Sequence, residues 1–145
     1  MIALIQRVNW AEVKVDAQSV GKINQGILAL VAVEKGDTEA SAKKMMEKIA
    51  NYRIFSDDNG KMNLSLLDTQ GELLLVSQFT LLANTDKGRR PSFSESPDPV
   101  VSKALFEYSI VCAKTLVSKV EQGQFAADMK VSLENDGPVT FWLNV

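Results

Sequence analysis

Residues 71–82, GELLLVSQFTLL, place the strongest constraint on the fold of this chain. The stretch opens with a glycine and continues almost entirely through apolar side chains, interrupted only by Ser77, Gln78 and Thr80. A strand without a polar face has no side to turn toward water, and such strands are typical of the centre of a sheet. The sequence therefore predicts a central strand here, covered on both faces.

The first 33 residues alternate in the manner of β-strands. They contain, in order, IALIQRV, AEVKVD, GKI and ILALVAV, and Val13 and Val15 alternate with charged neighbours in the second of these. The end of the chain also predicts two strands, FAADMKVSL at 125–133 and VTFWLNV at 139–145. NDGP at 135–138 has the composition of a tight turn between them.

Two segments have helical periodicity. The first follows Asp37 or Thr38, either of which can cap a helix of about four turns. Its apolar residues recur at three- and four-residue spacing: Ala42, Met45, Met46 and Ile49. The second covers residues 100–119, with a predicted apolar stripe of Val101, Ala104, Leu105, Tyr108 and Cys112. Between the helices, SDDNGK at 56–61 indicates a turn, and MNLSLL at 62–67 is compatible with a strand or a loop.

Size and composition predict one mixed α/β (α+β) domain spanning residues 1–145, since 46% of the residues are hydrophobic and can form a core. The longest apolar run, GILALVAV, is too short to span a membrane, and the first residues lack the features of a signal peptide. Cys112 is the only cysteine, so no disulfide can form within the chain. We therefore expect a cytoplasmic protein without a membrane segment.

The absence of histidine narrows the chemistry. Without it the chain can build no Ser-His or Cys-His dyad and no histidine-ligated metal centre, and the single cysteine excludes a cysteine cluster for zinc. We expect no metal and no cofactor. Catalysis must use carboxylates, lysines, hydroxyl groups, backbone amides or a group carried by the substrate.

Ser77, Gln78 and Thr80 admit three interpretations at the end of the predicted central strand. Their side chains can satisfy local backbone groups where the strand stops. Thr80 can act as a nucleophile, although no histidine is present to deprotonate it. Alternatively, backbone N–H groups at the transition from strand to loop can converge on a developing oxyanion, which requires no titratable side chain.

The polar loop at 83–99 contains Lys87, Arg89 and Arg90. The net charge of −2 and the pI of about 5.2 argue against an indiscriminate nucleic-acid binder. These cations are therefore either ordinary solvated charges or a local phosphate contact.

Gly137 and Pro138 admit a second interpretation besides a turn. A cis peptide bond costs only about 0.5–1 kcal/mol before proline, so it is feasible here. Such a pair has no proline N–H and no glycine side chain, and it presents carbonyl oxygens to whatever lies opposite. That surface could serve as a stereochemical gauge, that is, a rigid surface that distinguishes the D from the L form of a bound molecule.

Two motifs together resemble the signatures of D-aminoacyl-tRNA deacylases: SQFTL at 77–81 and NDGPVT at 135–140. Further stretches look like that family along the whole chain: MIALIQRV at 1–8, YRIFSD at 52–57, KMNL at 61–64, RPSFS at 90–94 and FAADMKVSL at 125–133. The resemblance implies a homodimer with a β-barrel-like mixed sheet and two main helices. It also implies hydrolysis of the ester that joins a D-amino acid, and also mischarged glycine, to the 3′ end of tRNA.

The resemblance further implies roles for individual residues. A cis Gly137–Pro138 pair would reach into the active site of the partner subunit, hold the substrate's amino group and exclude L side chains. Backbone amides near Phe79 and Thr80 would stabilise the oxyanion while the 2′-hydroxyl of the terminal adenosine helps to activate water; a nucleophilic Thr80 is the alternative. Four further residues would support the site: Gln78 by bracing it, Ser77 and Met129 by lining it, and Arg7 by holding the Gly-Pro segment.

Two other functions are alternatives to this one. An inactive RNA-binding module of the same fold would be expected to lose SQFT or Gly-Pro, yet both are present. A general esterase would need its own base and would ignore the tRNA.

Overall fold

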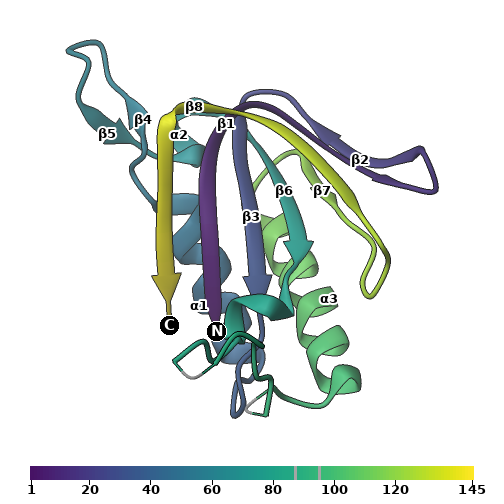
Figure 1. Ribbon diagram of the computed structural model, residues 1–145. Helices are drawn as coiled ribbons and strands as arrows, with labels where there is room; N and C mark the ends of the chain where they lie inside the picture. Colours follow the sequence, from purple (N-terminus) through teal and green to yellow (C-terminus); the bar gives the residue numbers. More distant parts are fainter. Residues whose placement is uncertain (87, 95) are drawn as a thin grey trace.

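The computed structural model describes residues 1–86, 88–94 and 96–145. A six-stranded mixed sheet forms its centre, with the order β2-β1-β3-β6-β7 and with β8 paired to the other edge of β1 (Figure 1). The β3–β6 and β6–β7 pairs are parallel, and the pairs made by β1 are antiparallel. The strands are β1 Ile2–Val15, β2 Gln18–Ile23, β3 Gly26–Ala32, β6 Glu72–Ser77, β7 Val120–Gln122 and β8 Lys130–Asn144.

The sheet curls on itself because β1 and β8 are long enough to serve two parts of it. Residues 2–8 of β1 pair with β3, and residues 11–15 pair with β2. The curl brings β2 against β7 so closely that a Cβ on Gly21 would lie 2.6 Å from the carbonyl oxygen of Gln122. The result is the barrel-like mixed sheet that the family resemblance implied.

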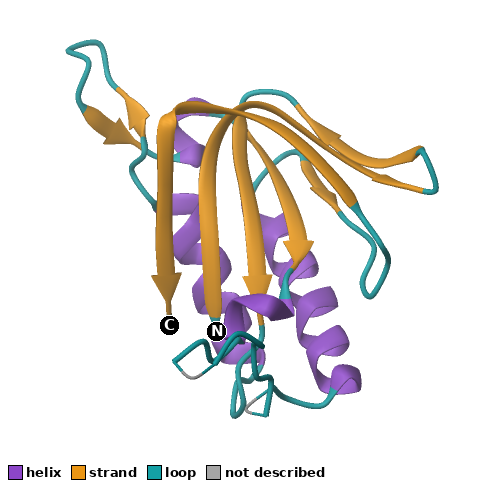
Figure 2. Ribbon diagram, viewed as in Figure 1, coloured by secondary structure: helices purple, strands orange, loops and turns teal. Residues whose placement is uncertain are grey.

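Helices cover one face of this sheet (Figure 2). The two main helices are α1 Glu39–Asn51 and α3 Pro99–Leu116, and the remaining elements are the short hairpin β4 Phe55–Ser56 and β5 Met62–Leu64, the single turn α2 Leu66–Thr69 and the 3₁₀ helix η1 Phe79–Leu82. Thr38 is the N-cap of α1, and its N–H donates to Ser41 Oγ at 3.2 Å. Within the described ranges, no helix is long and apolar enough to cross a membrane.

Strand β6 is buried on both faces, which confirms the prediction of a covered central strand. Leu73 and Leu75 belong to the core cluster between the sheet and the helices, which includes the predicted α1 residues Ala42, Met45, Met46 and Ile49. Leu74 and Val76 belong to a second cluster on the opposite face, inside the curl of the sheet. The alternation of a β-strand therefore divides one apolar run between two cores.

Two features of the predicted helices were wrong. The stripe chosen for α3 includes Val101, which is 48% exposed, whereas the buried residues of the helix are Leu105, Phe106, Ser109, Ile110 and Ala113. The helix is apolar over much of its surface, so periodicity alone did not fix the face. It also ends at Leu116 rather than Lys119, because the chain must turn into β7, a strand that the sequence did not reveal.

The predicted bounds of three strands, β8, β1 and β6, were also wrong. Residues 125–129 form a loop, and β8 then continues as one strand from Lys130 to Asn144, so NDGP is not a turn between two strands. Likewise β1 is a single strand rather than two, and β6 stops at Ser77 while residues 79–82 form η1.

Gly26 is required where β3 begins beside β6. A Cβ at this position would lie 1.8 Å from the carbonyl oxygen of Glu72, a backbone atom that cannot move without breaking the β3–β6 register. We expect Gly26→Ala to lower the free energy of unfolding by about 3 kcal/mol, as overpacking of a rigid site does. Urea denaturation measures this change.

Gly60→Ala serves as the control for Gly26→Ala. Gly60 has a positive φ of 72° but open space around its missing Cβ, so only backbone strain of about 1 kcal/mol is expected there. Equal losses in both variants would show that the contact between Gly26 and Glu72 is not the cause.

Candidate functional site

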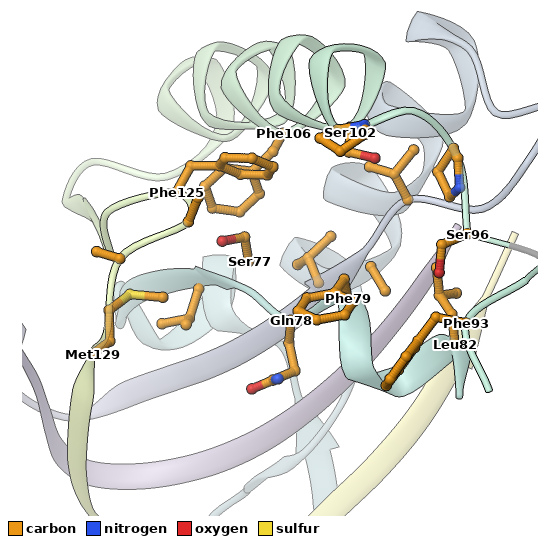
Figure 3. Close-up of a pocket in the computed structure, with 18 of the residues that line it drawn as sticks. Ser77, Gln78, Phe79, Leu82, Phe93, Ser96, Ser102, Phe106, Phe125 and Met129 are labelled. Atoms are coloured by element: carbon orange, nitrogen blue, oxygen red, sulfur yellow. The ribbon is translucent and has the colours of Figure 1, made fainter. Parts of the chain in front are cut away.

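A cavity of about 610 Å³ opens at the carboxyl ends of β3 and β6. One wall is formed by residues 31–33 and by Ser77, Gln78 and Phe79, and the facing wall is formed by Phe106 of α3 and the loop at 125–129 (Figure 3). Of the eight residues expected in the site, four line this cavity: Ser77, Gln78, Phe79 and Met129.

The backbone after β6 leaves N–H groups available beside the cavity. The N–H of Gln78 is used by the carbonyl of Val31 at 2.8 Å, and the N–H of Leu81 donates to Gln78 O at 3.2 Å. The 3₁₀ helix starts between them, at Phe79, and the first N–H groups of a helix have no partner within it. Phe79, which lines the cavity, and the adjoining Thr80 therefore offer two consecutive N–H groups that have no backbone partner among the described residues, an arrangement that suits an oxyanion.

The side chain of Thr80 lies outside the lining of the cavity and is exposed. Its hydroxyl accepts a hydrogen bond from Gln78 Nε2. Among the described residues that line the cavity, Asp128 is the one titratable side chain, and its carboxylate binds Lys130 Nζ at 2.9 Å. The described part of the site thus contains no base positioned to deprotonate Thr80, and the described residues contain no cluster of three or more potential metal ligands.

Aromatic rings form much of the wall, and three of them, Phe93, Phe106 and Phe125, were not identified as site residues from the sequence. Phe79 packs against Phe93 with ring centroids 5.1 Å apart, and Phe106 packs against Phe125 at 6.2 Å. These residues come from four separate segments, so no local spacing could have joined them. The motifs RPSFS and FAADM, in which Phe93 and Phe125 lie, were the available signal.

Met129 is held toward the cavity by the absence of a side chain at Gly123. A Cβ on Gly123 would lie 2.7 Å from Met129 Sδ, so the thioether packs directly on the glycine backbone. Met129 directly precedes Lys130, the first residue of β8, so its position is fixed by Gly123 on one side and by that strand on the other.

Gly137 and Pro138 lie at the tip of a protrusion on β8. The register places Asn135 opposite Val8 and Thr140 opposite Gln6, so four residues of β8 stand opposite a single residue of β1. The extra residues bulge out of the ladder, and Gly137 and Pro138 are exposed. The peptide bond between them is cis.

Two side chains brace this protrusion. Arg7 Nε contacts both the carbonyl and the carboxylate of Asp136 at 3.0 Å, while its Nη1 donates to the carbonyl of Ile54 at 2.7 Å. Asn135 closes the base, since its Oδ1 accepts from the Val139 N–H at 2.7 Å and its Nδ2 donates to Thr140 Oγ1 at 3.0 Å. The exposed tip is thereby presented as a fixed piece of backbone.

The protrusion and the cavity do not meet within one chain. Arg7 pairs with Ile27 near the start of β3, whereas Ser77 pairs with Val31 near its end. The protrusion and the cavity are therefore four residues apart along the strands, which is roughly 13 Å, and three strand spacings apart across the sheet, which is roughly 14 Å. Neither Gly137 nor Pro138 lines the cavity, so Arg7, Gly137 and Pro138 form a second, separate part of the candidate site.

Comparisons with known proteins identify curated relatives over the full chain. The chain is 60% identical to a D-aminoacyl-tRNA deacylase of Haemophilus influenzae (strain 86-028NP) and 57% identical to one of Actinobacillus pleuropneumoniae serotype 5b (strain L20). Each match covers 100% of both proteins.

Two solved structures are similar in fold. One is titled c-Myc DNA unwinding element binding protein, with a TM-score of 0.94 and 34% identity over 100% of this chain and 99% of that one. The other, described as a probable eukaryotic D-amino acid tRNA deacylase, has a TM-score of 0.86 over 99% of this chain and 98% of that one; at 16% identity it shows the fold alone. The model of the D-Tyr-tRNA(Tyr) deacylase family matches residues 4–144, and the chain belongs to that family.

Proposed function

We propose that this protein hydrolyses the ester of D-aminoacyl-tRNA, with water adding across the bond to release the free D-amino acid and intact tRNA. The observation that carries this proposal is the pair of N–H groups at Phe79 and Thr80, which have no backbone partner among the described residues and lie beside a cavity whose described lining contains no catalytic base. Membership of the deacylase family supports the same substrate class. Such a substrate places the enzyme in the cytoplasm.

In the proposed mechanism the ester carbonyl points at these N–H groups. Water attacks the carbonyl carbon, and the negative charge that develops on the oxygen is stabilised by the two donors, which need no reorganisation. The 2′-hydroxyl of the terminal adenosine assists the attacking water, because the sequence contains no histidine and the only carboxylate in the described cavity lining, that of Asp128, is paired with Lys130. Gln78 holds the Thr80 side chain away from the cavity, and Ser77 and Met129 shape the space for the substrate.

The protrusion on β8 acts in this proposal on the cavity of a second subunit. Its exposed position and its distance from the cavity of its own chain support that assignment. The outer edge of β8 has no neighbouring strand among those described, and Trp142 beside it is 52% exposed, two features that suit a homodimer interface. Arg7 then keeps the tip of the protrusion in the position needed by the partner.

The backbone carbonyls of the tip hold the α-amino group of the substrate and leave no room for an L side chain. The ester carbon, through which the tRNA is attached, and the amino group fix two of the four bonds of the α-carbon. The hydrogen and the side chain occupy the other two positions, and in an L residue the side chain takes the position that points at the tip. A hydrogen in the direction of the tip causes no collision, and glycyl-tRNA is therefore a substrate as well as D-aminoacyl-tRNA.

The experiment that tests this function compares D-tyrosyl-tRNA with D-tyrosine methyl ester, using wild type, Thr80→Ala and Ala127→Trp. Wild type should hydrolyse the tRNA ester and leave the small ester untouched. Thr80→Ala should retain activity within about tenfold, since the N–H groups remain and deletion of an essential donor costs about 2.7–4 kcal/mol. Ala127→Trp fills the cavity and should abolish hydrolysis.

Three results would contradict the proposal. Hydrolysis of the methyl ester at a comparable rate would indicate a general esterase. Tight binding of tRNA without hydrolysis would indicate a binding module. Loss of activity in folded Thr80→Ala, together with an acyl-enzyme trapped on wild type, would make Thr80 the nucleophile.

A further inference from the structure

A second cavity, of about 450 Å³, lies behind the aromatic wall of the first. Phe106 and Phe125 line both cavities, and their rings are tilted by 40° with centroids 6.2 Å apart. The two spaces are therefore separated by little more than these two rings. Figure 3 shows the rings on the side of the first cavity that faces α3, opposite Gln78 and Phe79.

The second cavity differs from the first in its chemistry. Around the two rings it carries two exposed carboxamides, Gln122 and Gln124, on the segment that continues from β7. The α3 side contributes Lys103 and Glu107, which form a loose pair at 3.8 Å and are 58% and 61% exposed. An exposed pair of this kind contributes little to stability, so both charges are available to a ligand.

We propose that this second cavity binds the nucleotide that precedes the terminal adenosine of the tRNA. The inference rests on the proposed function, which places the terminal adenosine and its ester in the first cavity. Proteins read unpaired nucleotides by stacking bases on aromatic rings and by hydrogen bonds to base edges. The second cavity provides both kinds of contact next to the catalytic one, and its stacking surface is the half-buried ring of Phe125, since Phe106 is only 2% exposed.

Each polar group matches a part of a nucleotide. A glutamine carboxamide both donates and accepts, so it can form two hydrogen bonds to a base edge, and a carboxylate accepts from an exocyclic amino group. Glu107 and the two glutamines therefore favour a base with an exocyclic amino group. Lys103 supplies a point charge for the connecting phosphate.

The alternative occupant is the side chain of the D-amino acid, and substrate size separates the two. D-Tyrosyl-adenosine contains the amino acid and the terminal nucleoside but lacks the preceding nucleotide. Removing contacts to that nucleotide should therefore weaken hydrolysis of D-tyrosyl-tRNA and leave hydrolysis of D-tyrosyl-adenosine unchanged.

The test uses Gln122→Ala/Gln124→Ala and Lys103→Ala, with Gln18→Ala and Lys114→Ala as matched controls that are exposed and outside both cavities. We expect the glutamine variant to lower kcat/KM for D-tyrosyl-tRNA by about tenfold, the effect of a lost pair of base contacts. Lys103→Ala should lower it less and weaken its dependence on salt. The control variants should leave kcat/KM unchanged for both D-tyrosyl-tRNA and D-tyrosyl-adenosine.

A second measurement ties the effect to the base itself. With a tRNA that is abasic at the preceding position, wild type and the glutamine variant should have the same kcat/KM, because the contact is already absent. Equal losses on D-tyrosyl-tRNA and D-tyrosyl-adenosine, or no loss on either, would overturn the inference. Failure of wild type to hydrolyse either substrate would instead refute the proposed function.

Discussion

D-Tyrosyl-tRNA is expected to be hydrolysed at least about a hundredfold faster than L-tyrosyl-tRNA. An L side chain would be directed at the backbone of Gly137 and Pro138, and this backbone is braced by Arg7 and Asn135, so it cannot move aside. Forcing a side chain into rigid, packed surroundings costs about 3 kcal/mol, which corresponds to roughly a hundredfold in rate. Single-turnover deacylation of the two charged tRNAs measures the ratio directly.

D-Aspartyl-tRNA and glycyl-tRNA belong in the same experiment. Rejection by collision does not depend on the identity of a D side chain, so both should be hydrolysed at rates similar to that of D-tyrosyl-tRNA. Comparable rates for D- and L-tyrosyl-tRNA would refute the gauge. Activity on one D-amino acid alone would require a side-chain pocket.

Two inactive variants should restore each other's activity when they form a mixed dimer. Gly137→Ala damages the protrusion, because φ at this residue is 145° and a Cβ would lie 2.6 Å from Val139 Cγ2. Ala127→Trp fills the cavity. Misplacing a positioning group by about 1 Å can cost a hundredfold in rate, so Gly137→Ala alone should lose activity by about that factor, and Ala127→Trp alone should be inactive because its cavity is blocked.

In the mixed dimer the intact cavity of the Gly137→Ala subunit receives the intact protrusion of the Ala127→Trp subunit. One of its two sites is complete, so the doubly tagged heterodimer should have about half of the wild-type activity. If the protrusion served the cavity of its own chain, neither site would be complete and no activity would return. A fully active monomer would also contradict the exchange of protrusions.

The sequence predicted those elements in which the pattern of apolar residues indicates clearly which side chains are buried. The apolar run of β6 and the spacing of Met45, Met46 and Ile49 in α1 each indicated a burial that the structure confirms. The face of α3 was not predictable, because apolar residues such as Val101 and Val111 also occupy its exposed side. The short β7 was missed, since its pairing with β6 depends on a parallel contact between distant segments.

The candidate site was predictable only in part, because the same local composition is compatible with more than one backbone structure. The available N–H groups of Phe79 and Thr80 follow from the abrupt change from strand to 3₁₀ helix. The polar residues after Val76 suggested a transition from strand to loop, but they did not indicate the 3₁₀ helix. NDGP instead suggested a turn, because turn composition and a multi-residue bulge use the same residues. Only the register of β8 against β1 shows that the strand continues past the bulge.

Met129 lies just before the first residue of β8, and Gly137 lies within that strand. A single continuous strand therefore connects the cavity of its own subunit to the protrusion. Pairing with β1 holds the intervening residues in register. An insertion or deletion of one residue there would shift Gly137 by about 3.3 Å relative to Met129 and reverse which side chains face the core. Side-chain changes at the exposed positions Lys130, Ser132 and Glu134 should be tolerated, but a change in the number of residues should not, because the spacing between the two functional parts is set by chain length.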